Sequence, residues 1–381
     1  MWRKVISMML VLSLFFTSFS FAENKLNLTG KAAYLIEAET GETLYSYNEH
    51  EVLRPASVTK VMTLLLIMEA LEDGSISLDD LVPCSERARK MGGSQIWLNE
   101  NEKLTVNDML KAICVVSAND CCVAMSEFLG GSEEVFVEMM NQRAKELGMK
   151  DTTFKNCHGI DEEGHVTSAY DIAIMSRELI KHKKIFDYTT IWMDSLRDGK
   201  SQLVNTNRLI RFYDGANGLK TGSTSLALYN LSATAKRDNM QLVGVILGAP
   251  TTKDRFNDAT KLLDYGFANY AVTMLDEKGT EVGDTKVERG EEDFVTGVIA
   301  EDVSKLTEKK GLKGVERQVN FMRLKAPVKA GEQIGEMVYL KDGAEIAKVA
   351  ICAKYDVDKL SFPKSFMKIF NGWFRMGRET V

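Results

Sequence analysis

Residues 61–71 form an almost continuous apolar run that follows closely on Pro55 and Ser57. A proline, then a serine, then a run of this length predicts a helix that begins near Ala56. Because the run is apolar on every side, the helix is expected to cross the middle of a domain. Lys60 is unusual in such a helix. It lies one turn after Ser57 on the same face, where burial would favour a neutral amine beside the hydroxyl.

The hydrophobic pattern up to residue 270 switches between strand-like and helix-like periods. Residues 31–47 alternate around a Glu-Thr-Gly turn and predict a β-hairpin, and residues 228–248 predict a second one. Helical patterns lie between and after these hairpins, at 104–116, 121–129, 132–147, 168–182 and 251–270, and a polar loop with two histidines covers 151–167. Strands first and last with helices between them predict an α/β or α+β domain of about 240 residues.

From residue 272 the pattern changes to short, charged β-segments separated by glycine turns, such as 295–299 and 326–331. This predicts a small all-β domain over 272–357. Residues 358–381 differ again, because large apolar side chains recur there at helical spacing with lysine and arginine between them: Phe366, Ile369, Phe370, Trp373 and Phe374. That pattern is typical of a cationic amphipathic helix at a membrane interface, and a helix packed on the β-domain is the alternative.

The first residues predict export. Arg3 and Lys4 precede an apolar run that ends in Ser20-Phe21-Ala22, which is the pattern of a cleaved secretory signal peptide over 1–22. A membrane anchor is the alternative. With cleavage after Ala22, the mixed α/β domain is expected over 23–271, on the outer face of the cytoplasmic membrane or beyond it.

Charge and cysteine content narrow the class of protein further. A formal net charge of -6 and a pI near 5.5 argue against nucleic acid as a partner. The six cysteines include the adjacent pair Cys121-Cys122, and such spacing suits small core residues better than a disulfide framework. We therefore expect free thiols.

Three short patterns carry candidate chemistry. Ser57 and Lys60 form a Ser-x-x-Lys pattern, which also occurs at Ser361/Lys364 and Ser365/Lys368 and is therefore weak by itself. Ser117-Ala118-Asn119 places a hydroxyl and an amide in a short break between helices. Lys220-Thr221-Gly222 lies beside a β-run, where the lysine and hydroxyl could bind a carboxylate and the glycine could admit a substrate backbone.

In this order, the three patterns resemble those of the penicillin-recognising serine transferases. Within that family the chain is similar to the low-molecular-mass penicillin-binding proteins that are D-alanyl-D-alanine carboxypeptidases. The likeness extends to residues 54–60, 117–120, 158–159 and 167–171, and to the β-domain and the tail. Cys121-Cys122 departs from it, since alanines are usual there, and only a packing change is expected. The resemblance implies a β-lactamase/DD-peptidase-like domain with an antiparallel sheet and a helical subdomain.

The same resemblance implies a role for each pattern. Ser57 would be the nucleophile, Lys60 the general base, and Ser117 the relay that passes a proton to the departing D-alanine. Substrate binding would fall to Asn119, Lys220, Thr221, Gly222, the backbone N–H groups of Ser57 and Ser223 as an oxyanion hole, and Arg208 and Arg255. The implied partners are peptidoglycan stem peptides, with β-lactam antibiotics as their mimics, and no metal or cofactor is expected.

Three other functions fit parts of the sequence. A class A-like β-lactamase shares the three patterns, but Asp161, Glu162 and Glu163 lack the Glu-x-x-Leu-Asn context expected for its deacylating base. A zinc peptidase could use Cys157, His158, His165 and Asp161, although no His-Glu-x-x-His is present. A non-catalytic wall-binding protein is the third alternative, and the complete set of three patterns argues against it.

Overall fold

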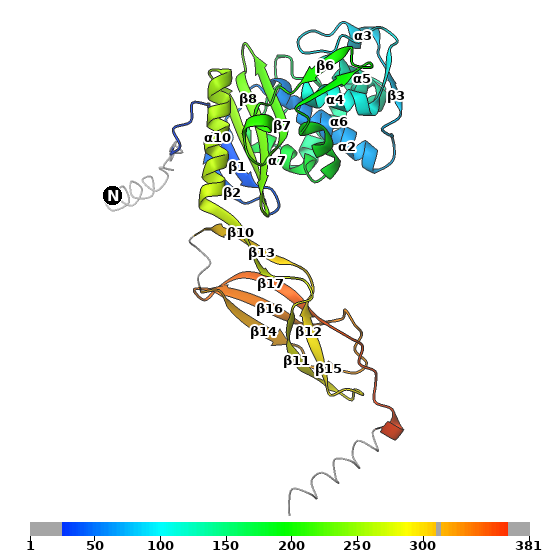
Figure 1. The fold of residues 1–381 in the computed structure, drawn as a ribbon, viewed down its shortest axis with the longest axis vertical. Helices are drawn as coiled ribbons and strands as arrows, with labels where there is room; N and C mark the ends of the chain where they lie inside the picture. Colours follow the sequence, from blue (N-terminus) through cyan, green and yellow to red (C-terminus); the bar gives the residue numbers. More distant parts are fainter. Residues whose placement is uncertain (1–24, 310–313, 365–381) are drawn as a thin grey trace, which may run out of the picture. The chain divides into compact units, whose positions relative to one another are not determined.

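The computed structural model describes residues 25–309 and 314–364, so the predicted signal peptide and most of the predicted tail helix lie outside the described residues (Figure 1). The chain forms two compact units that divide between Gly266 and Phe267. No helix within the described ranges is both long enough and apolar enough to span a membrane.

A five-stranded antiparallel sheet forms the centre of the first unit, with the strand order β2-β1-β9-β8-β7. The strands are β1 (Ala32–Glu37), β2 (Thr43–Tyr47), β7 (Ala216–Thr224), β8 (Leu228–Arg237) and β9 (Met240–Ala249). Both predicted hairpins are confirmed, as β1–β2 and β8–β9. The two hairpins join through β1 and β9, where Ala33 pairs with Ile246, so the first strand of the chain lies inside the sheet and is buried along its whole length.

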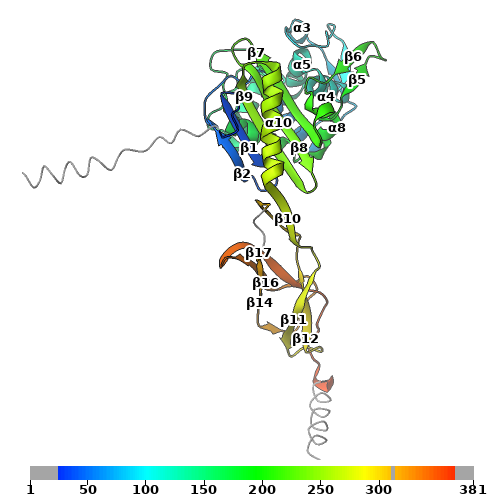
Figure 2. The ribbon, with the colours of Figure 1, turned by 60° about the vertical axis from the view of Figure 1, so that its left-hand side comes forward.

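Helices cover both faces of this sheet (Figures 1 and 2). The helix α10 (Thr252–Asn269) packs Leu262 and Leu263 over Gly244 of β9, where a Cβ would lie only 3.4–3.5 Å from the two leucines. On the other face, α7 (Ala169–Leu179) packs on β1 and β9, and its Ser176 hydroxyl bonds that of Ser232 on β8 at 2.7 Å. The sheet is thus the middle layer of three.

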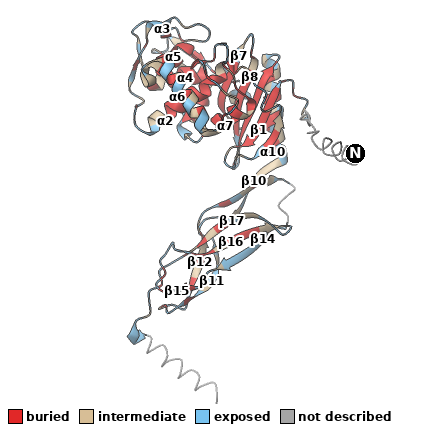
Figure 3. Ribbon diagram, turned by 180° about the vertical axis from the view of Figure 1, so that it is seen from behind, coloured by how far each residue is buried: buried red, intermediate tan, exposed pale blue. Residues whose placement is uncertain are grey.

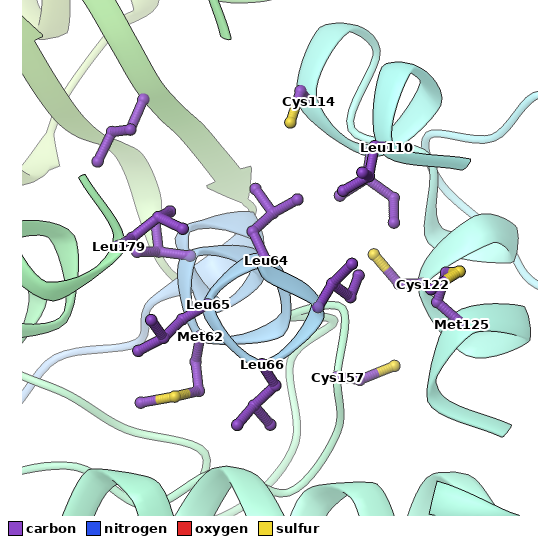
Figure 4. Close-up of a cluster of buried hydrophobic side chains, with 14 of the residues drawn as sticks. Met62, Leu64, Leu65, Leu66, Leu110, Cys114, Cys122, Met125, Cys157 and Leu179 are labelled. Atoms are coloured by element: carbon purple, nitrogen blue, oxygen red, sulfur yellow. The ribbon is translucent and has the colours of Figure 1, made fainter. Parts of the chain in front are cut away.

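The apolar run after Lys60 forms α2 (Lys60–Glu72), and its first nine residues are all buried. Figure 4 shows leucines of α2 pointing outward into a ring of apolar and sulfur-bearing side chains from neighbouring segments: Leu110, Cys114, Cys122, Met125, Cys157 and Leu179. The predicted central helix is therefore confirmed. Each of its leucines contributes roughly 1.5–3 kcal/mol through burial.

The predicted helices around α2 are present, although α5 begins at Asn119, two residues before the expected start at residue 121. They are α4 (Val106–Val115), α5 (Asn119–Gly130) and α6 (Glu133–Glu146), and Figure 3 shows how much of this region is buried. The hydroxyl of Thr105 accepts a bond from the N–H of Asp108, and Ser132 caps α6 in the same way. The helix α5 ends at Gly131, whose φ of 77° is left-handed.

Shorter elements complete the first unit. They are η2 (Ala56–Thr59), β3 (Leu81–Pro83), α3 (Glu86–Arg89), β4 (Lys103–Thr105), η3 (Lys183–Ile185), α8 (Phe186–Thr189), β5 (Met193–Leu196), β6 (Ser201–Val204) and α9 (Leu209–Phe212). Two further sequence-based expectations also differ from the structure. The first turn at Ala56 is a 3-10 turn, with the α-helix starting at Lys60, and Lys220-Thr221-Gly222 lies inside a strand and not beside one.

The second unit is the predicted small β-domain. A six-stranded sheet with the order β14-β16-β17-β12-β11-β15 is accompanied by the pair β10-β13. The strands are β10 (Tyr270–Asp276), β11 (Glu281–Glu288), β12 (Phe294–Ile299), β13 (Val303–Glu308), β14 (Glu316–Phe321), β15 (Leu324–Lys325), β16 (Gln333–Lys341) and β17 (Ala344–Ala353). The predicted segment 326–331 is not a strand, and only Val328 forms a bridge, to Val357. Val295, Tyr339 and Ile351 anchor the separate core of this unit.

All six cysteines are free thiols, as the sequence predicted. Five are buried, and Cys121 and Cys122 are fully enclosed in the core of the first unit. Burial raises the pKa of the Cys122 thiol to about 12, so the thiol stays protonated and behaves as a small apolar side chain.

Candidate active site

Ser57 lies on a tight turn enclosed by two other segments. Its neighbours Ala56 and Val58 are buried, while Ser57 itself is half-buried. Two glycines make this enclosure possible. A Cβ on Gly222 of β7 would lie 3.0 Å from the Ser57 nitrogen, and a Cβ on Gly159 would lie 1.9 Å from the Ala56 oxygen. The turn is therefore held between β7 and the 151–167 loop, and Ala56 takes a left-handed φ of 49°, a conformation rare for a residue with a side chain.

Lys60 is completely buried and points at the nucleophile. Its Nζ lies 3.0 Å from Ser57 Oγ, and it donates to Asn119 Oδ1 and to the His158 carbonyl, both at 2.6 Å. These contacts join α2, α5 and the 151–167 loop at one nitrogen. Burial lowers the pKa of Lys60, and the charge of Asp120 only partly opposes this.

The neighbours of Lys60 suit a neutral amine. An amine without its third proton keeps two N–H donors and gains a lone pair. Asn119 Oδ1 and the His158 carbonyl are acceptors that take the two donors, which leaves the lone pair for the Ser57 hydroxyl. The arrangement therefore places a base within hydrogen-bond distance of a nucleophile.

Ser117 presents an unsatisfied hydroxyl. The residue takes a left-handed φ of 65° in the break between α4 and α5 and is 4% exposed. Its Oγ has no hydrogen-bond partner among the residues that the structure describes. A buried hydroxyl without a partner costs free energy unless another molecule bonds it, so this geometry suits a group that acts on a bound substrate.

Asn119 ties the site to a loop that the sequence did not single out. Its Nδ2 donates to the Gly92 carbonyl at 2.7 Å, and its backbone N–H donates to the Ser94 carbonyl at 2.7 Å. We expected the Asn119 amide to bond the substrate backbone, whereas here both of its side-chain atoms bond within the protein. Its role toward the substrate stays a prediction. Its visible role is to hold Lys60 and the 92–94 segment together.

Lys220 and Thr221 are consecutive residues of β7, and both are buried. Lys220 Nζ donates to the Thr221 carbonyl at 2.8 Å, and Thr221 Oγ1 bonds Thr206 Oγ1 at 2.8 Å. Burial, and next the charge of Lys60, hold the pKa of Lys220 well below its usual range. The two lysines therefore influence each other's protonation. Gly222 was expected to admit a substrate backbone, but the backbone that approaches it is that of the Ser57 turn.

The two arginines differ in their surroundings. Arg208 is exposed at the start of α9. Arg255 is 6% exposed, donates to the Gly222 and Asn230 carbonyls at 3.2 and 3.3 Å, and lies over the ring of Phe256. Burial lowers the pKa of Arg255 to about 10. Arg255 therefore links the main chains of β7 and β8. A carboxylate contact by either arginine stays a prediction.

The two histidines of the 151–167 loop are structural. His165 accepts from the Lys155 N–H at its Nδ1 and bonds Thr59 Oγ1 at its Nε2, each at 2.8 Å, and burial lowers its pKa to about 4. His158 accepts from the Ile160 N–H, and burial and the charge of Lys60 lower its pKa to about 3. With both nitrogens of His165 occupied, the donor set suggested for zinc is not assembled, and no three-residue metal cluster occurs among the described residues.

The fold thus brings together Ser57, Lys60, Ser117, Asn119, Lys220, Thr221 and Gly222 from three distant parts of the chain, with Ser223 next in the strand. The sequence reasoning missed the His158 carbonyl, the 92–94 segment, Asp120 and Thr206. Asp120 and His158 lie in the segments 117–120 and 158–159 that the family resemblance included, but neither was given a role in this site. A backbone carbonyl leaves no mark in the residue types.

Two family models and a curated protein are similar to this chain. A family model described as D-alanyl-D-alanine carboxypeptidase matches residues 19–251, and one described as Penicillin-binding protein 5, C-terminal domain, matches residues 270–359. The D-alanyl-D-alanine carboxypeptidase DacF of Bacillus subtilis (strain 168) is 45% identical over 348 residues, 90% of each chain.

Two solved structures are similar as well. Penicillin-binding protein 5 from Haemophilus influenzae has a TM-score of 0.72 and 31% identity over 87% of this chain and 98% of its own. Penicillin-binding protein D2 from Listeria monocytogenes, in its ampicillin-bound form, has a TM-score of 0.59 and 32% identity over 64% of this chain and 99% of its own.

Proposed function

The chain belongs to the D-alanyl-D-alanine carboxypeptidase family, and from that membership we propose that it removes the terminal D-alanine from peptidoglycan pentapeptide stems. The reaction proceeds through an ester on Ser57, and β-lactam antibiotics, which mimic the D-alanyl-D-alanine end, acylate the same oxygen. The observation that carries the assignment of residues is the position of Lys60, 3.0 Å from Ser57 Oγ with its other two contacts to acceptors.

In the first half of the reaction Ser57 Oγ attacks the carbonyl carbon between the two D-alanines while its proton passes to Lys60 Nζ. The N–H groups of Ser57 and Ser223 donate hydrogen bonds to the carbonyl oxygen and stabilise the negative charge that develops on it. The carbon–nitrogen bond then breaks, and Ser117 delivers its proton to the departing amine. Lys60 passes the proton that it took from Ser57 on to Ser117, so that Ser117 is a hydroxyl and Lys60 a neutral amine again. D-alanine leaves, and the shortened stem remains as an ester on Ser57.

In the second half a water molecule hydrolyses the ester. Lys60 takes a proton from the water, and the hydroxyl adds to the ester carbon. The bond to Ser57 Oγ then breaks as Lys60 returns the proton to that oxygen, which regenerates both the alcohol and the neutral amine. Thr221 and Lys220 bind the terminal carboxylate of the substrate before the first step, and β7 lies against the Ser57 turn so that this end is held next to the nucleophile. The strand β7 therefore carries both the residues that bind the carboxylate and one N–H group of the proposed oxyanion hole.

The test is D-alanine release from diacetyl-Lys-D-Ala-D-Ala by the exported chain, with and without penicillin. We expect release that penicillin abolishes, together with a mass increase of one penicillin on the protein. Ser57→Ala should lose both. D-alanine release by Ser57→Ala at the wild-type rate would refute the assignment, and rapid turnover of penicillin without a persistent adduct would favour the β-lactamase alternative.

We also propose where the enzyme works. The signal-peptide pattern of residues 1–22 supports export, and the amphipathic pattern of residues 358–381 supports attachment to the outer face of the cytoplasmic membrane. The wall substrate is made of polymers outside that membrane, so this location would place the site beside its substrate.

A further inference from the structure

A cavity of about 670 Å³ adjoins the catalytic residues without containing them. One wall is the 93–97 segment, the other is β6 with the turn before it, and Val116, the residue before Ser117, lines the cavity between them. None of the residues in the three sequence patterns lines it. The cavity is therefore a separate recess that begins at the edge of the site.

Trp97 stands at the rim of this cavity in an unfavourable conformation. It is 73% exposed, while its neighbours Ile96 and Leu98 are 4% and 2% exposed. Its φ of 54° is left-handed, which is rare and strained for a bulky residue. A large aromatic side chain that is strained and exposed at once contributes nothing to the core, so its position calls for another explanation.

The surrounding residues hold Trp97 in this position. Asp120 accepts from the N–H groups of Ile96 and Leu98, each at 3.1 Å, and Arg197 donates to the carbonyls of Ile96 and Trp97 at 2.8 and 3.3 Å. The Gln95 amide, turned so that both of its atoms are satisfied, accepts from the indole N–H at 3.2 Å. The aromatic face is thus fixed before any ligand arrives, which lowers the entropy cost of binding.

The rest of the cavity is rich in hydrogen-bonding groups and is lined by no acidic side chain. Ser94, Ser201 and Gln202 line it, and Lys200 is exposed there with no ion-pair partner in the described part of the chain. An aromatic face beside hydroxyl and amide groups suits a sugar ring, whose C–H face is apolar and whose rim carries hydroxyl and acetamido groups.

The reach from the site to this cavity fits the substrate. Four residues of a pentapeptide stem separate the sugar from the carbonyl that is attacked, and an extended chain of four residues spans up to about 14 Å. Because Val116 is next to Ser117, the near wall of the cavity lies well inside this reach.

We propose that this cavity, with Trp97 as its platform, binds the glycan to which the stem peptide is attached. The inference rests on the proposed function, because it makes the glycan part of the same substrate. Trp97 touches no reacting atom and acts only by binding the sugar. The enzyme is therefore expected to prefer a stem that carries its sugars over the same stem without them.

The experiment compares kcat/KM for D-alanine release from three substrates by the exported chain. They are diacetyl-Lys-D-Ala-D-Ala, a sugar-free pentapeptide, and the same pentapeptide on its N-acetylglucosaminyl-N-acetylmuramic acid disaccharide. In Trp97→Ala the ratio of kcat/KM for the disaccharide peptide to that for the sugar-free peptide should fall about three- to tenfold. Trp97→Phe should keep most of the ratio. Phe212→Ala is the matched control, since Phe212 is 72% exposed and does not line the cavity, and it should leave the ratio unchanged.

Each other outcome overturns the inference. If Trp97→Ala leaves the ratio of the two kcat/KM values unchanged, Trp97 does not bind the sugar. An equal change of this ratio in Phe212→Ala would show that loss of any exposed aromatic side chain has the same effect. A loss on the sugar-free pentapeptide that matches the loss on the disaccharide peptide assigns the cavity to the peptide. Failure of the wild-type chain to release D-alanine from the small substrate would instead refute the proposed function, so the two failures are distinguishable. Acylation by penicillin reports whether each variant keeps its folded site.

Discussion

Lys60 is a buried amine whose three polar neighbours decide how many protons it holds. Burial lowers its pKa, and its partners are two acceptors and one hydroxyl. Sequence alone suggested a neutral lysine beside Ser57, because both lie on one face of an apolar helix. It could not supply the partners, since one is the main-chain carbonyl of His158 and the other belongs to a helix 59 residues further on.

The first prediction concerns the pH dependence of acylation. Because only neutral Lys60 can take the proton of Ser57, the rate of acylation by penicillin should rise with pH and level off above the pKa. That pKa is lowered from the ordinary value of 10.5, so the plateau should begin at a lower pH than a solvent-exposed lysine would give. Stopped-flow measurement of acylation from pH 5 to 10 checks this.

Lys60→Arg is the matched variant for the same measurement. A guanidinium keeps its charge at every pH in this range, so acylation should fall by about 10²- to 10⁴-fold and lose its acid limb. If the variant kept the wild-type rise of the acylation rate with pH, another group would be the base. Circular dichroism of both proteins controls for loss of fold.

At the scale of elements, the site depends on how closely β7 approaches the Ser57 turn. Gly222 has no room for a side chain, because a Cβ would lie 2.9 Å from the Val58 nitrogen and 3.0 Å from both Ser57 N and Pro55 O. These are main-chain atoms of a turn that Gly159 encloses from the other side, so neither segment can yield without moving the nucleophile. The contact sets the distance between Ser57 and the strand that carries Lys220 and Thr221.

The second prediction follows from this contact. Gly222→Ala should push β7 from the turn, lower the free energy of unfolding by about 1–3 kcal/mol, and reduce the second-order rate of penicillin acylation by about 10²-fold. Chemical denaturation and acylation kinetics measure the two effects. Gly279→Ala is a suitable control for stability, since Gly279 has nothing within 4 Å of its Cβ position, although its φ of 85° adds a local strain. Wild-type acylation by Gly222→Ala would show that the close approach is not needed.

The elements that the sequence predicted well are those with a periodic pattern and a cap. The helices α4 and α6 begin at Thr105 and Ser132 because those hydroxyls satisfy free N–H groups of the first turn. The strand β7 was missed because it consists largely of polar and glycine residues that are buried by tertiary contacts, as Lys220 and Thr221 are. The Trp97 segment was missed for a related reason. Its conformation depends on a bond that the Asp120 carboxylate accepts from the Leu98 N–H and on one that Arg197 donates to the Trp97 carbonyl, and both partners are distant in sequence.

At the scale of the whole molecule, the chemistry and the predicted attachment belong to different parts of the chain. Every residue of the three patterns lies in the first unit, and the second unit is a β-domain with its own core. The sequence predicted this division from the change of pattern near residue 272. From our proposal that the tail attaches the enzyme to the membrane, we expect loss of the tail to change where the enzyme works and to leave its chemistry intact.

The third prediction tests that separation in the full-length mature chain. In Phe370→Asp/Trp373→Asp two side chains of the predicted apolar stripe become charged, and partition onto vesicles of mixed anionic and zwitterionic lipid should fall at least about tenfold, because burial of each aromatic contributes roughly 1.5–3 kcal/mol. Release of D-alanine from diacetyl-Lys-D-Ala-D-Ala should stay within about twofold of wild type. Asn371→Asp adds a negative charge on the polar side of the same predicted helix and leaves the apolar stripe intact. It therefore distinguishes the effect of charge from the loss of apolar side chains, and it should weaken the partition far less. Equal loss of partition in both variants would indicate simple electrostatic attraction, and no loss in either would place the attachment elsewhere.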